Sequence, residues 1–352
     1  MADTQGQSKT ISIKLVDKPI GPIGFGLMGL TWRKDPPSQE QAFDTLKAAL
    51  EVGANFWNGG EMYGSPDRHS GHLLAEYFRK YPEDADRIVL SIKGGLEKDK
   101  LEPNATEGNI RRSVDDVLAT LRGTNVKIDI FENARVDPRV PVEDSVRVLK
   151  TLAQDERKIG GIGLSEVRAS TIERAAAAVA PATIAAVEVE LSLWNTDILR
   201  NGVAATAAKL GIPIVAYSPL GRGALAGGDK LIATTADLPE HDPRRHYPQF
   251  QDDALAQNNR LVVEVAALAK RKGVTRAQVA IAWVRQQTGR EVPDGQGGTV
   301  RLGTIIPIPG ATTRARVLEN SKLVELTEEE LLELDEIVKR NPIKGTRYPA
   351  AI

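Results

Sequence analysis

The sequence contains no cysteine among its 352 residues. This absence excludes disulfide bonds, thiolate metal sites and cysteine nucleophiles. Histidine is also scarce, because only His69, His72, His241 and His246 are present. They form no recognisable cluster of metal ligands, so we expect a protein that uses no metal.

Neither sign of charge is in excess, since 46 Lys and Arg residues face 47 Asp and Glu residues. A general nucleic-acid binder would be strongly basic. No apolar run reaches the roughly 18 residues that span a bilayer. The first ten residues lack the charged-then-apolar pattern of a signal peptide. We therefore expect a cytoplasmic protein with no nucleic-acid or membrane partner.

Eight short, Val- and Ile-rich runs alternate with longer segments of helical periodicity. The predicted strands are residues 23–26, 55–58, 87–93, 128–134, 161–165, 185–191, 212–218 and 303–308. The predicted helices are residues 39–50, 72–80, 106–121, 142–156, 171–179, 197–210, 259–272, 276–287 and 313–322. Repeated strand–helix–strand units imply parallel strands joined by right-handed crossovers. Eight of them predict an α/β fold, a (β/α)8 TIM barrel, as a single domain over residues 1–352.

Two segments fall outside the eight units. Residues 11–18 alternate weakly and predict an N-terminal β-hairpin that closes the barrel floor. Residues 328–340 predict an extra C-terminal helix capped by Thr327. The longest irregular stretch, residues 221–257, is typical of either a functional lid or a disordered segment.

The run GFGLMG at residues 24–29 has the glycine spacing of a dinucleotide-binding loop. That motif requires a helix to begin at its third glycine. Pro36 and Pro37 predict no helix before about Ser38. We therefore favour a glycine-rich loop at the mouth of the barrel.

In such barrels the chemistry lies at the C-terminal ends of the strands. Tyr63 and Lys93 follow neighbouring strands, and a nearby ammonium lowers the pKa of a phenol. Such a tyrosine can protonate a carbonyl oxygen as a hydride arrives. Residues 310–320, GATTRARVLEN, fit either a phosphate cradle or a capped helix with solvated charges.

The runs IGFGLMGL, EMYG, SIKGG, GIGLSE, AYSPLGRG and PIPG…LEN occur in an order that resembles the aldo-keto reductases. The variants NFWNGGEMYGSPD and ENARVDP look closest to the fungal-type pyridoxal reductases. This resemblance implies NADPH-dependent reduction of a small aldehyde, pyridoxal to pyridoxine, by a protein expected to be a monomer. A broader aryl-aldehyde or ketone reductase and a slow NADPH-binding sensor stay open.

The resemblance also implies residue roles. Tyr63 would be the general acid, with Lys93 and Asn58 beside it. Ser165, Glu166 and Glu188 would hold the nicotinamide carboxamide, Tyr217 would stack on its ring, and Arg316 would take the 2′-phosphate. The full expected coenzyme set is Gly26, Leu27, Met28, Ser165, Glu166, Glu188, Tyr217, Ser218, Leu220, Gly221, Gly223, Thr312, Thr313, Arg316, Glu319 and Asn320. The expected substrate pocket is Trp32, Ala134 and Arg135.

Two positions depart from the family pattern. Asn58 stands where the family has Asp, and Ala134 stands where it has His. Catalysis is either lost or adapted, and we favour adaptation, with Ala134 leaving room for a substituted ring. Glu132 should share the inward face of its strand with Ala134, and we expect it to pair with Lys93. His69 and His72 are either a replacement catalytic histidine or polar residues at a helix start.

Overall fold

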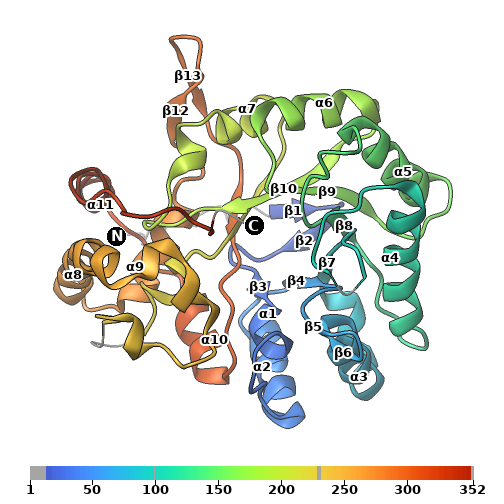
Figure 1. The fold of residues 1–352 in the computed structure, drawn as a ribbon, viewed down its shortest axis with the longest axis horizontal. Coiled ribbons are helices and arrows are strands. Elements are labelled where there is room, and N and C mark those ends of the chain that lie inside the picture. The colour runs from blue at the N-terminus through green and yellow to red at the C-terminus, as the bar shows by residue number, and fades with distance from the viewer. Residues whose placement is uncertain (1–12, 99, 228–230, 350–352) are drawn as a thin grey trace, which may run out of the picture.

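The computed structural model describes residues 13–98, 100–227 and 231–349. Eight parallel strands form its centre, in the order β3-β4-β7-β8-β9-β10-β11-β14 (Figure 1). They are β3 Phe25–Gly26, β4 Phe56–Gly60, β7 Val89–Gly94, β8 Ile130–Asn133, β9 Gly161–Ser165, β10 Ile184–Glu190, β11 Ile214–Tyr217 and β14 Ile305–Pro307. The sheet closes because Gly24 N donates to Pro307 O at 2.9 Å and Gly26 bridges Gly310. The predicted (β/α)8 barrel is confirmed.

Glycine permits this closure because the first strand lies tightly between its two neighbours. A Cβ on Gly24 would lie 2.8 Å from the carbonyl oxygen of Phe56, and one on Gly26 would lie 3.0 Å from that of Ile308. Such contacts are shorter than ordinary van der Waals separations. The glycines of the GFGLMG run therefore allow close backbone approach.

Helices surround the strands (Figure 1). They are α2 Gln39–Glu51, α3 Ser70–Lys80, α4 Glu107–Thr120, α5 Val142–Gln154, α6 Ala169–Val179, α7 Val203–Lys209, α8 Asp252–Lys272, α9 Arg276–Arg285, α10 Arg314–Ser321 and α11 Glu328–Arg340. Side-chain caps fix several starts: Ser38 accepts from Gln41 N, and Thr327 accepts from Glu330 N. The extra C-terminal helix α11 is confirmed and packs beside α8.

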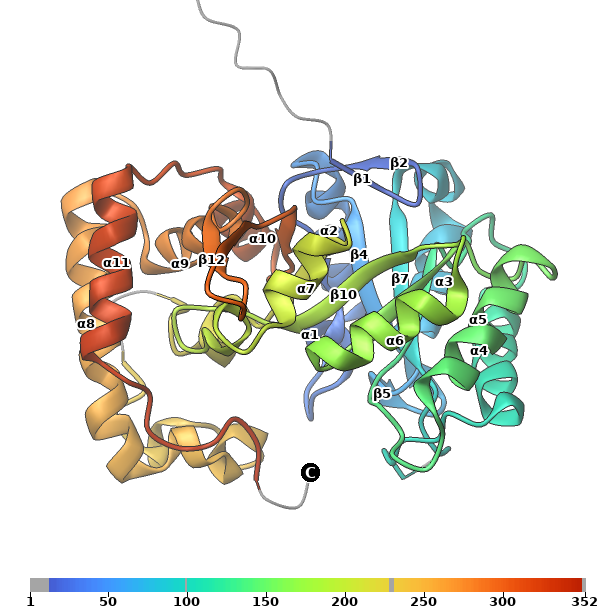
Figure 2. The same cartoon turned by 90° about the horizontal axis from the view of Figure 1, so that it is seen from above.

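The hairpin β1 Ile13–Leu15 and β2 Lys18–Ile20 covers one end of the barrel, and the chain after α11 runs to the other end (Figure 2). Leu15 and Ile20 are buried against a layer of inward side chains, so the predicted floor is confirmed. That floor layer consists of Phe56, Val89, Ile130, Ala186, Val215 and Ile306. The hairpin ends at Ile20 rather than residue 18, and the start of the predicted segment lies outside the described residues.

Several element boundaries were predicted wrongly. Helix α8 begins at Asp252, not at residue 259, and a short helix α1, Met28–Thr31, forms before Ser38. The helix predicted at 197–210 is interrupted because Gly202 has φ of 88°, which leaves a 3-10 turn followed by α7. Two hairpins were not anticipated: β5 Gly64–Ser65 with β6 Arg68–His69, and β12 Glu291–Pro293 with β13 Thr299–Arg301.

Residues 221–257, where described, form short 3-10 helices before α8 begins. These are η3 Gly221–Gly223, η4 Thr235–Asp237, η5 Pro243–His246 and η6 Pro248–Phe250. Trp194 Nε1 donates to Gln249 Oε1 at 3.1 Å, and Arg244 Nη1 donates to Arg222 O at 2.9 Å. The first bond ties the segment to the chain that follows β10, and the second lies within the segment, while its role as a lid stays a prediction.

No helix within the described ranges is long and apolar enough to cross a membrane. Over the same ranges, no group of three or more His, Asp or Glu side chains is arranged to hold a metal ion.

Candidate active site

Strand alternation decides which side chains enter the barrel. Moving from the floor layer toward the mouth, every second residue of a strand faces inward. Four of the polar side chains that this rule carries into the interior form one cluster, and each of the four is at most 4% exposed. They are Asn58 on β4, Lys93 on β7, Glu132 on β8 and Glu188 on β10.

The Lys93 ammonium is the centre of this cluster. Its Nζ lies 3.5 Å from Glu132 Oε1, which confirms the predicted pairing. Glu188 Oε1 is nearer, at 2.5 Å, and Asn58 Oδ1 accepts from Nζ at 2.7 Å. Asn58 Nδ2 in turn donates to Glu188 Oε2 at 2.6 Å. Glu188, which was expected to hold the nicotinamide carboxamide, therefore lies in an ion pair with Lys93.

Tyr63 lies in the turn after β4, above this cluster. The Lys93 ammonium is 5.6 Å from the centre of its ring, and Trp32 stacks on it at 5.5 Å between ring centres. Thr31 Oγ1 donates to Tyr63 O at 2.5 Å, which fixes the turn against α1. Tyr63 and Lys93 are thus brought together at the mouth.

The pKa of Tyr63 is raised, not lowered as the sequence predicted. Burial raises it most, the charge of Lys93 and a hydrogen bond to it lower it, and the charge of Glu188 raises it again. Burial alone would lower the pKa of Lys93, but Glu188, Tyr63 and Glu132 together raise it above its ordinary value. The expectation failed because it counted one ammonium and omitted burial and two carboxyl groups.

Two of the expected carboxamide ligands, Ser165 and Glu166, lie at the end of β9, and Ser218, expected at the pyrophosphate, follows β11. Ser165 Oγ is buried without a hydrogen-bond partner, so it is available to an incoming polar group. Glu166 and Ser218 have φ of 51° and 50°, which marks two tight backbone turns at the mouth. An unpartnered hydroxyl beside such turns fits an amide-bearing coenzyme.

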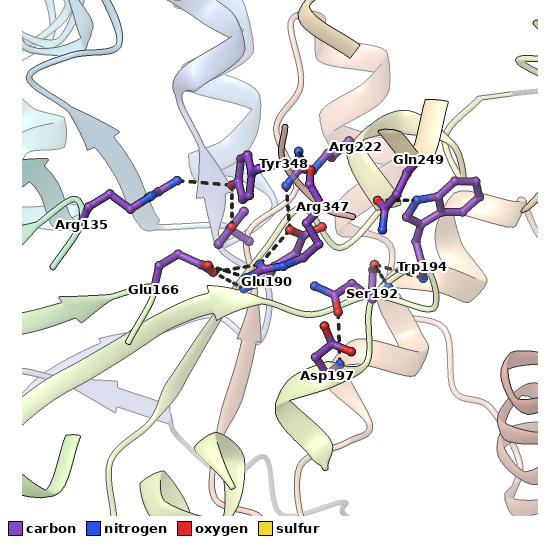
Figure 3. Close-up of polar contacts among 12 residues, drawn as sticks. Arg135, Glu166, Glu190, Ser192, Trp194, Asp197, Arg222, Gln249, Arg347 and Tyr348 are labelled. Atoms are coloured by element: carbon purple, nitrogen blue, oxygen red, sulfur yellow. Dashed lines mark hydrogen bonds and ion pairs between the residues drawn. The ribbon is translucent and has the colours of Figure 1, made fainter. Parts of the chain in front are cut away.

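The C-terminal segment after α11 crosses this mouth (Figure 3). Arg347 forms ion pairs with Glu166 at 2.8 Å and with Glu190 at 3.2 Å. The Tyr348 hydroxyl lies 3.0 Å from the Tyr217 hydroxyl. The segment therefore contacts Glu166 and Tyr217, two side chains that are expected to bind the nicotinamide.

Three further contacts complete this mouth cluster. Arg135 Nη2 donates to Tyr348 Oη at 3.3 Å, and Arg222 Nη2 pairs with Glu190 Oε2 at 2.8 Å. Sequence reasoning assigned no role to Arg222, Glu190, Arg347 or Tyr348. Glu190 was detectable, because it shares the inward face of β10 with Glu188. The sequence around Arg347 and Tyr348 contains no pattern that predicts their contacts at the mouth.

The expected phosphate site lies at the start of α10. Thr313 caps the helix by accepting from Arg316 N at 3.4 Å, and Arg316 pairs with Glu319 at 2.6 Å. Asn320 is buried, whereas the Arg316 side chain is half-exposed. The capped-helix interpretation is confirmed, and binding of a phosphate there stays a prediction.

The other expected contacts lie around the same rim. Leu27 and Gly221 are buried, Met28 is half-exposed, and Gly221 has φ of 56° with its Cα facing Trp194. Ala134 is buried at the end of β8, where its N donates to Gly94 O at 2.8 Å. Leu220, Gly223 and Thr312 flank them, and no contact distinguishes their roles.

His69 and His72 begin α3. His69 Nδ1 accepts from Gly71 N at 3.0 Å, and His72 Nδ1 accepts from His69 N at 3.4 Å. Burial, with the charge of His72, lowers the pKa of His69 to about 4. The helix-start interpretation of these histidines is confirmed.

Known proteins resemble the chain over most of its length. The family model described as "Aldo/keto reductase family" matches residues 22–339. "Probable pyridoxal reductase 2" of Schizosaccharomyces pombe is 38% identical over 94% of this chain and 95% of its own. A Saccharomyces cerevisiae protein, provisionally named a pyridoxal reductase, is 36% identical over 93% and 96%.

Solved structures agree on the fold. A glycerol dehydrogenase from Gluconobacter oxydans superposes with a TM-score of 0.74 at 25% identity, covering 95% of this chain and 98% of its own. An aldo-keto reductase from Klebsiella pneumoniae, solved with NADPH, has a TM-score of 0.66 at 20% identity, covering 96% and 98%. The barrel, the Tyr63–Lys93 pair and these likenesses together show that the chain belongs to the aldo/keto reductase family of NADP-dependent oxidoreductases.

Proposed function

We propose that this protein reduces an aldehyde to an alcohol with NADPH, and that its substrate is pyridoxal, which becomes pyridoxine. The observation that carries the reaction type is Tyr63, half-buried at the barrel mouth beside the Lys93 ammonium. The names of the two yeast relatives, similar over nearly the whole chain, support the choice of aldehyde.

The residues of the chain supply the proton half of the reaction. NADPH, when bound, supplies the hydride to the aldehyde carbon. Tyr63 carries its proton at neutral pH, as a phenol does, and its raised pKa extends this state into alkaline pH. It donates that proton to the aldehyde oxygen. The Lys93 ammonium stabilises the phenolate that remains, and solvent returns the proton. Ser165, Glu166 and Tyr217 are proposed to hold the nicotinamide, and Arg316 the 2′-phosphate.

The mouth also fits an aromatic aldehyde. Trp32 is 42% exposed and lies nearly parallel to the Tyr63 ring, so a flat ring can stack on its free face. Ala134 adds only a methyl group at the position after β8. Both features suit a substituted pyridine ring near Tyr63.

NADPH oxidation with pyridoxal and a panel of aryl and aliphatic aldehydes tests this proposal. We expect the highest kcat/KM for pyridoxal, with one pyridoxine formed for each NADPH consumed. Equal kcat/KM across aryl aldehydes would show a broad aryl-aldehyde reductase instead. Tight NADPH binding without turnover of any aldehyde would show a coenzyme sensor.

Replacing Ala134 by His tests the space near Tyr63. An imidazole at this buried position narrows the mouth, so Ala134→His should lower kcat/KM for pyridoxal by about tenfold or more. A small aliphatic aldehyde should lose less. A larger loss for the aliphatic aldehyde would contradict the role of Ala134 in making room for a ring.

A further inference from the structure

The cluster around Lys93 contains one ammonium and two carboxyl groups. Lys93, Glu132 and Glu188 are all at most 4% exposed, and Lys93 Nζ contacts both carboxyl groups. Burying two carboxylates against one ammonium would leave an uncompensated negative charge at high cost in free energy. One of the two carboxyl groups must therefore be neutral.

The backbone brings these two glutamates together across an intervening strand. Glu132 lies on β8 and Glu188 on β10, and β9 runs between them. The inward position of β9 is Gly163, which pairs in register with Glu132. A Cβ on Gly163 would lie 2.9 Å from Glu132 Oε2. The missing side chain thus provides the space in which the carboxyl group of Glu132 lies.

The contacts distinguish the two carboxyl groups. Glu188 makes the short contact to Lys93 Nζ, at 2.5 Å, and accepts from Asn58 Nδ2 at 2.6 Å. Glu132 makes only the longer contact, at 3.5 Å. Burial, reinforced by the charge of Glu188, raises the pKa of Glu132 well above its usual value. Glu188 is the charged partner, and Glu132 is the neutral acid.

We propose that Glu188 is a positioning residue that acts on Tyr63 through Lys93, as the carboxylate that holds the ammonium in place and balances its charge. Asn58 orients Glu188 by bonding both it and Lys93, and Glu132 is an uncharged neighbour. The positioning role of Glu188 extends the proposed function and rests on it for one point, the role of Tyr63 as proton donor. It replaces the expected role of Glu188 as a nicotinamide ligand.

The charges around Tyr63 predict how its pKa responds. The titratable and charged groups that face the Lys93–Tyr63 pair are Glu132, Glu188 and Arg135. In Glu188→Gln the carboxyl group of Glu132 can ionise in place of Glu188, through its longer contact to Lys93. The double variant Glu132→Gln/Glu188→Gln leaves no carboxyl group beside the ammonium, so the phenolate is favoured and the pKa of Tyr63 should fall by about one unit or more.

Tyrosinate absorbance measures this pKa in the coenzyme-free protein, when each titration is compared with that of its Tyr63→Phe counterpart. Glu132→Gln is the matched control: it replaces a neutral acid by a neutral amide, so its shift should stay below about half a unit. Asn58→Asp/Glu188→Gln exchanges carboxylate and amide within one hydrogen-bonded pair. It should return the pKa to within about half a unit of the wild-type value.

Three outcomes would overturn the proposal. They are an unshifted Tyr63 titration in Glu132→Gln/Glu188→Gln, a shift that the exchanged pair does not reverse, and an equal shift in Glu132→Gln alone. If Glu188→Gln does not fold, the exchanged pair must restore folding, because it returns a carboxylate to the buried ammonium. These titrations need no substrate, so failure of every aldehyde would count against the proposed function and leave the role of Glu188 standing.

Discussion

Tyr63 keeps its proton from neutral into alkaline pH, because burial and the nearby Glu188 raise its pKa above the ordinary value of a phenol by more than Lys93 lowers it. A phenol in this state is ready to act as an acid in reduction, whereas alcohol oxidation requires the phenolate. The rate of aldehyde reduction should therefore stay level from neutral to mildly alkaline pH, and the rate of alcohol oxidation should rise with pH.

Removing the Tyr63 hydroxyl tests this proton transfer. Tyr63→Phe should lower kcat for aldehyde reduction by about 10²- to 10⁴-fold, the usual contribution of a general acid. The dissociation constant of NADPH, measured by fluorescence titration, should change little, because the hydroxyl is assigned to the aldehyde oxygen. Undiminished turnover in Tyr63→Phe would refute the mechanism.

His69 links stability to pH at the start of α3. Its Nδ1 accepts from Gly71 N, and its pKa falls to about 4 from 6.5. Between these pH values the unfolded chain binds a proton that the folded protein excludes, so the free energy of unfolding decreases as the pH falls. At pH 5 this loss is about 2 kcal/mol.

The variant His69→Asn should remove this dependence, because asparagine keeps a cap acceptor but does not titrate. Urea unfolding at pH 7.5 and pH 5 measures the effect. The drop in the free energy of unfolding should be about 2 kcal/mol smaller than in the wild-type protein. His241→Asn, at an exposed position, should behave like wild type. Equal drops in His69→Asn and wild type would contradict the assignment.

At the scale of elements, we expect the C-terminal segment and the coenzyme to compete for the same side chains. Arg347 pairs with Glu166, and Tyr348 contacts Tyr217, yet both partners are expected to bind the nicotinamide. Coenzyme binding must then break these contacts, and their cost is subtracted from its affinity.

Arg347→Ala should tighten NADPH binding by about 5- to 20-fold, because one or two partly buried ion pairs no longer need to be broken. Lys344→Ala is the control, since Lys344 pairs with Asp253, away from the mouth. Equilibrium titration of NADPH fluorescence measures both variants. Weaker binding in Arg347→Ala would mean that the guanidinium contacts the coenzyme directly.

At the scale of the whole molecule, closure of the barrel depends on contacts between the first strand, β3, and the last strand, β14. Gly24 N donates to Pro307 O, nearly the whole chain apart. A Cβ on Gly24 would lie 2.8 Å from Phe56 O and 2.9 Å from Ile308 Cγ2, and the backbone oxygen cannot simply rotate away. Closure therefore requires a residue without a side chain at this position.

Gly24→Ala should lower the free energy of unfolding by about 1–3 kcal/mol, the usual cost of an overpacked core. Gly108→Ala offers the opposite case, because a Cβ there meets nothing within 4 Å and the position lies in α4. It should be neutral or stabilise the protein by up to about 1 kcal/mol. Chemical unfolding compares the two. Equal stability in both variants would show that closure tolerates a Cβ at Gly24.

The sequence by itself determined the eight strand–helix units, the floor hairpin, the C-terminal helix and the positions of Tyr63 and Lys93 at strand ends. These follow from periodicity and capping, which are local. Local signals also predicted that Glu132 faces Lys93, because alternation fixes the face of each strand residue. They failed at α8 and at Gly202, where a boundary depends on packing or on a single backbone angle.

Only the tertiary structure decided the electrostatics of the mouth. Glu188 lies nearer to Lys93 than Glu132 does, although Glu132 is on the strand next to β7 and Glu188 is two strands farther on, and Gly163 leaves the space in which the Glu132 carboxyl group lies. Arg347 reaches Glu166 from the far end of the chain. Burial and charge–charge distances depend on all the groups that surround a site. These groups come from distant parts of the chain, so no single stretch of sequence reveals them. For this reason the pKa of Tyr63 was predicted in the wrong direction although the residue itself was found.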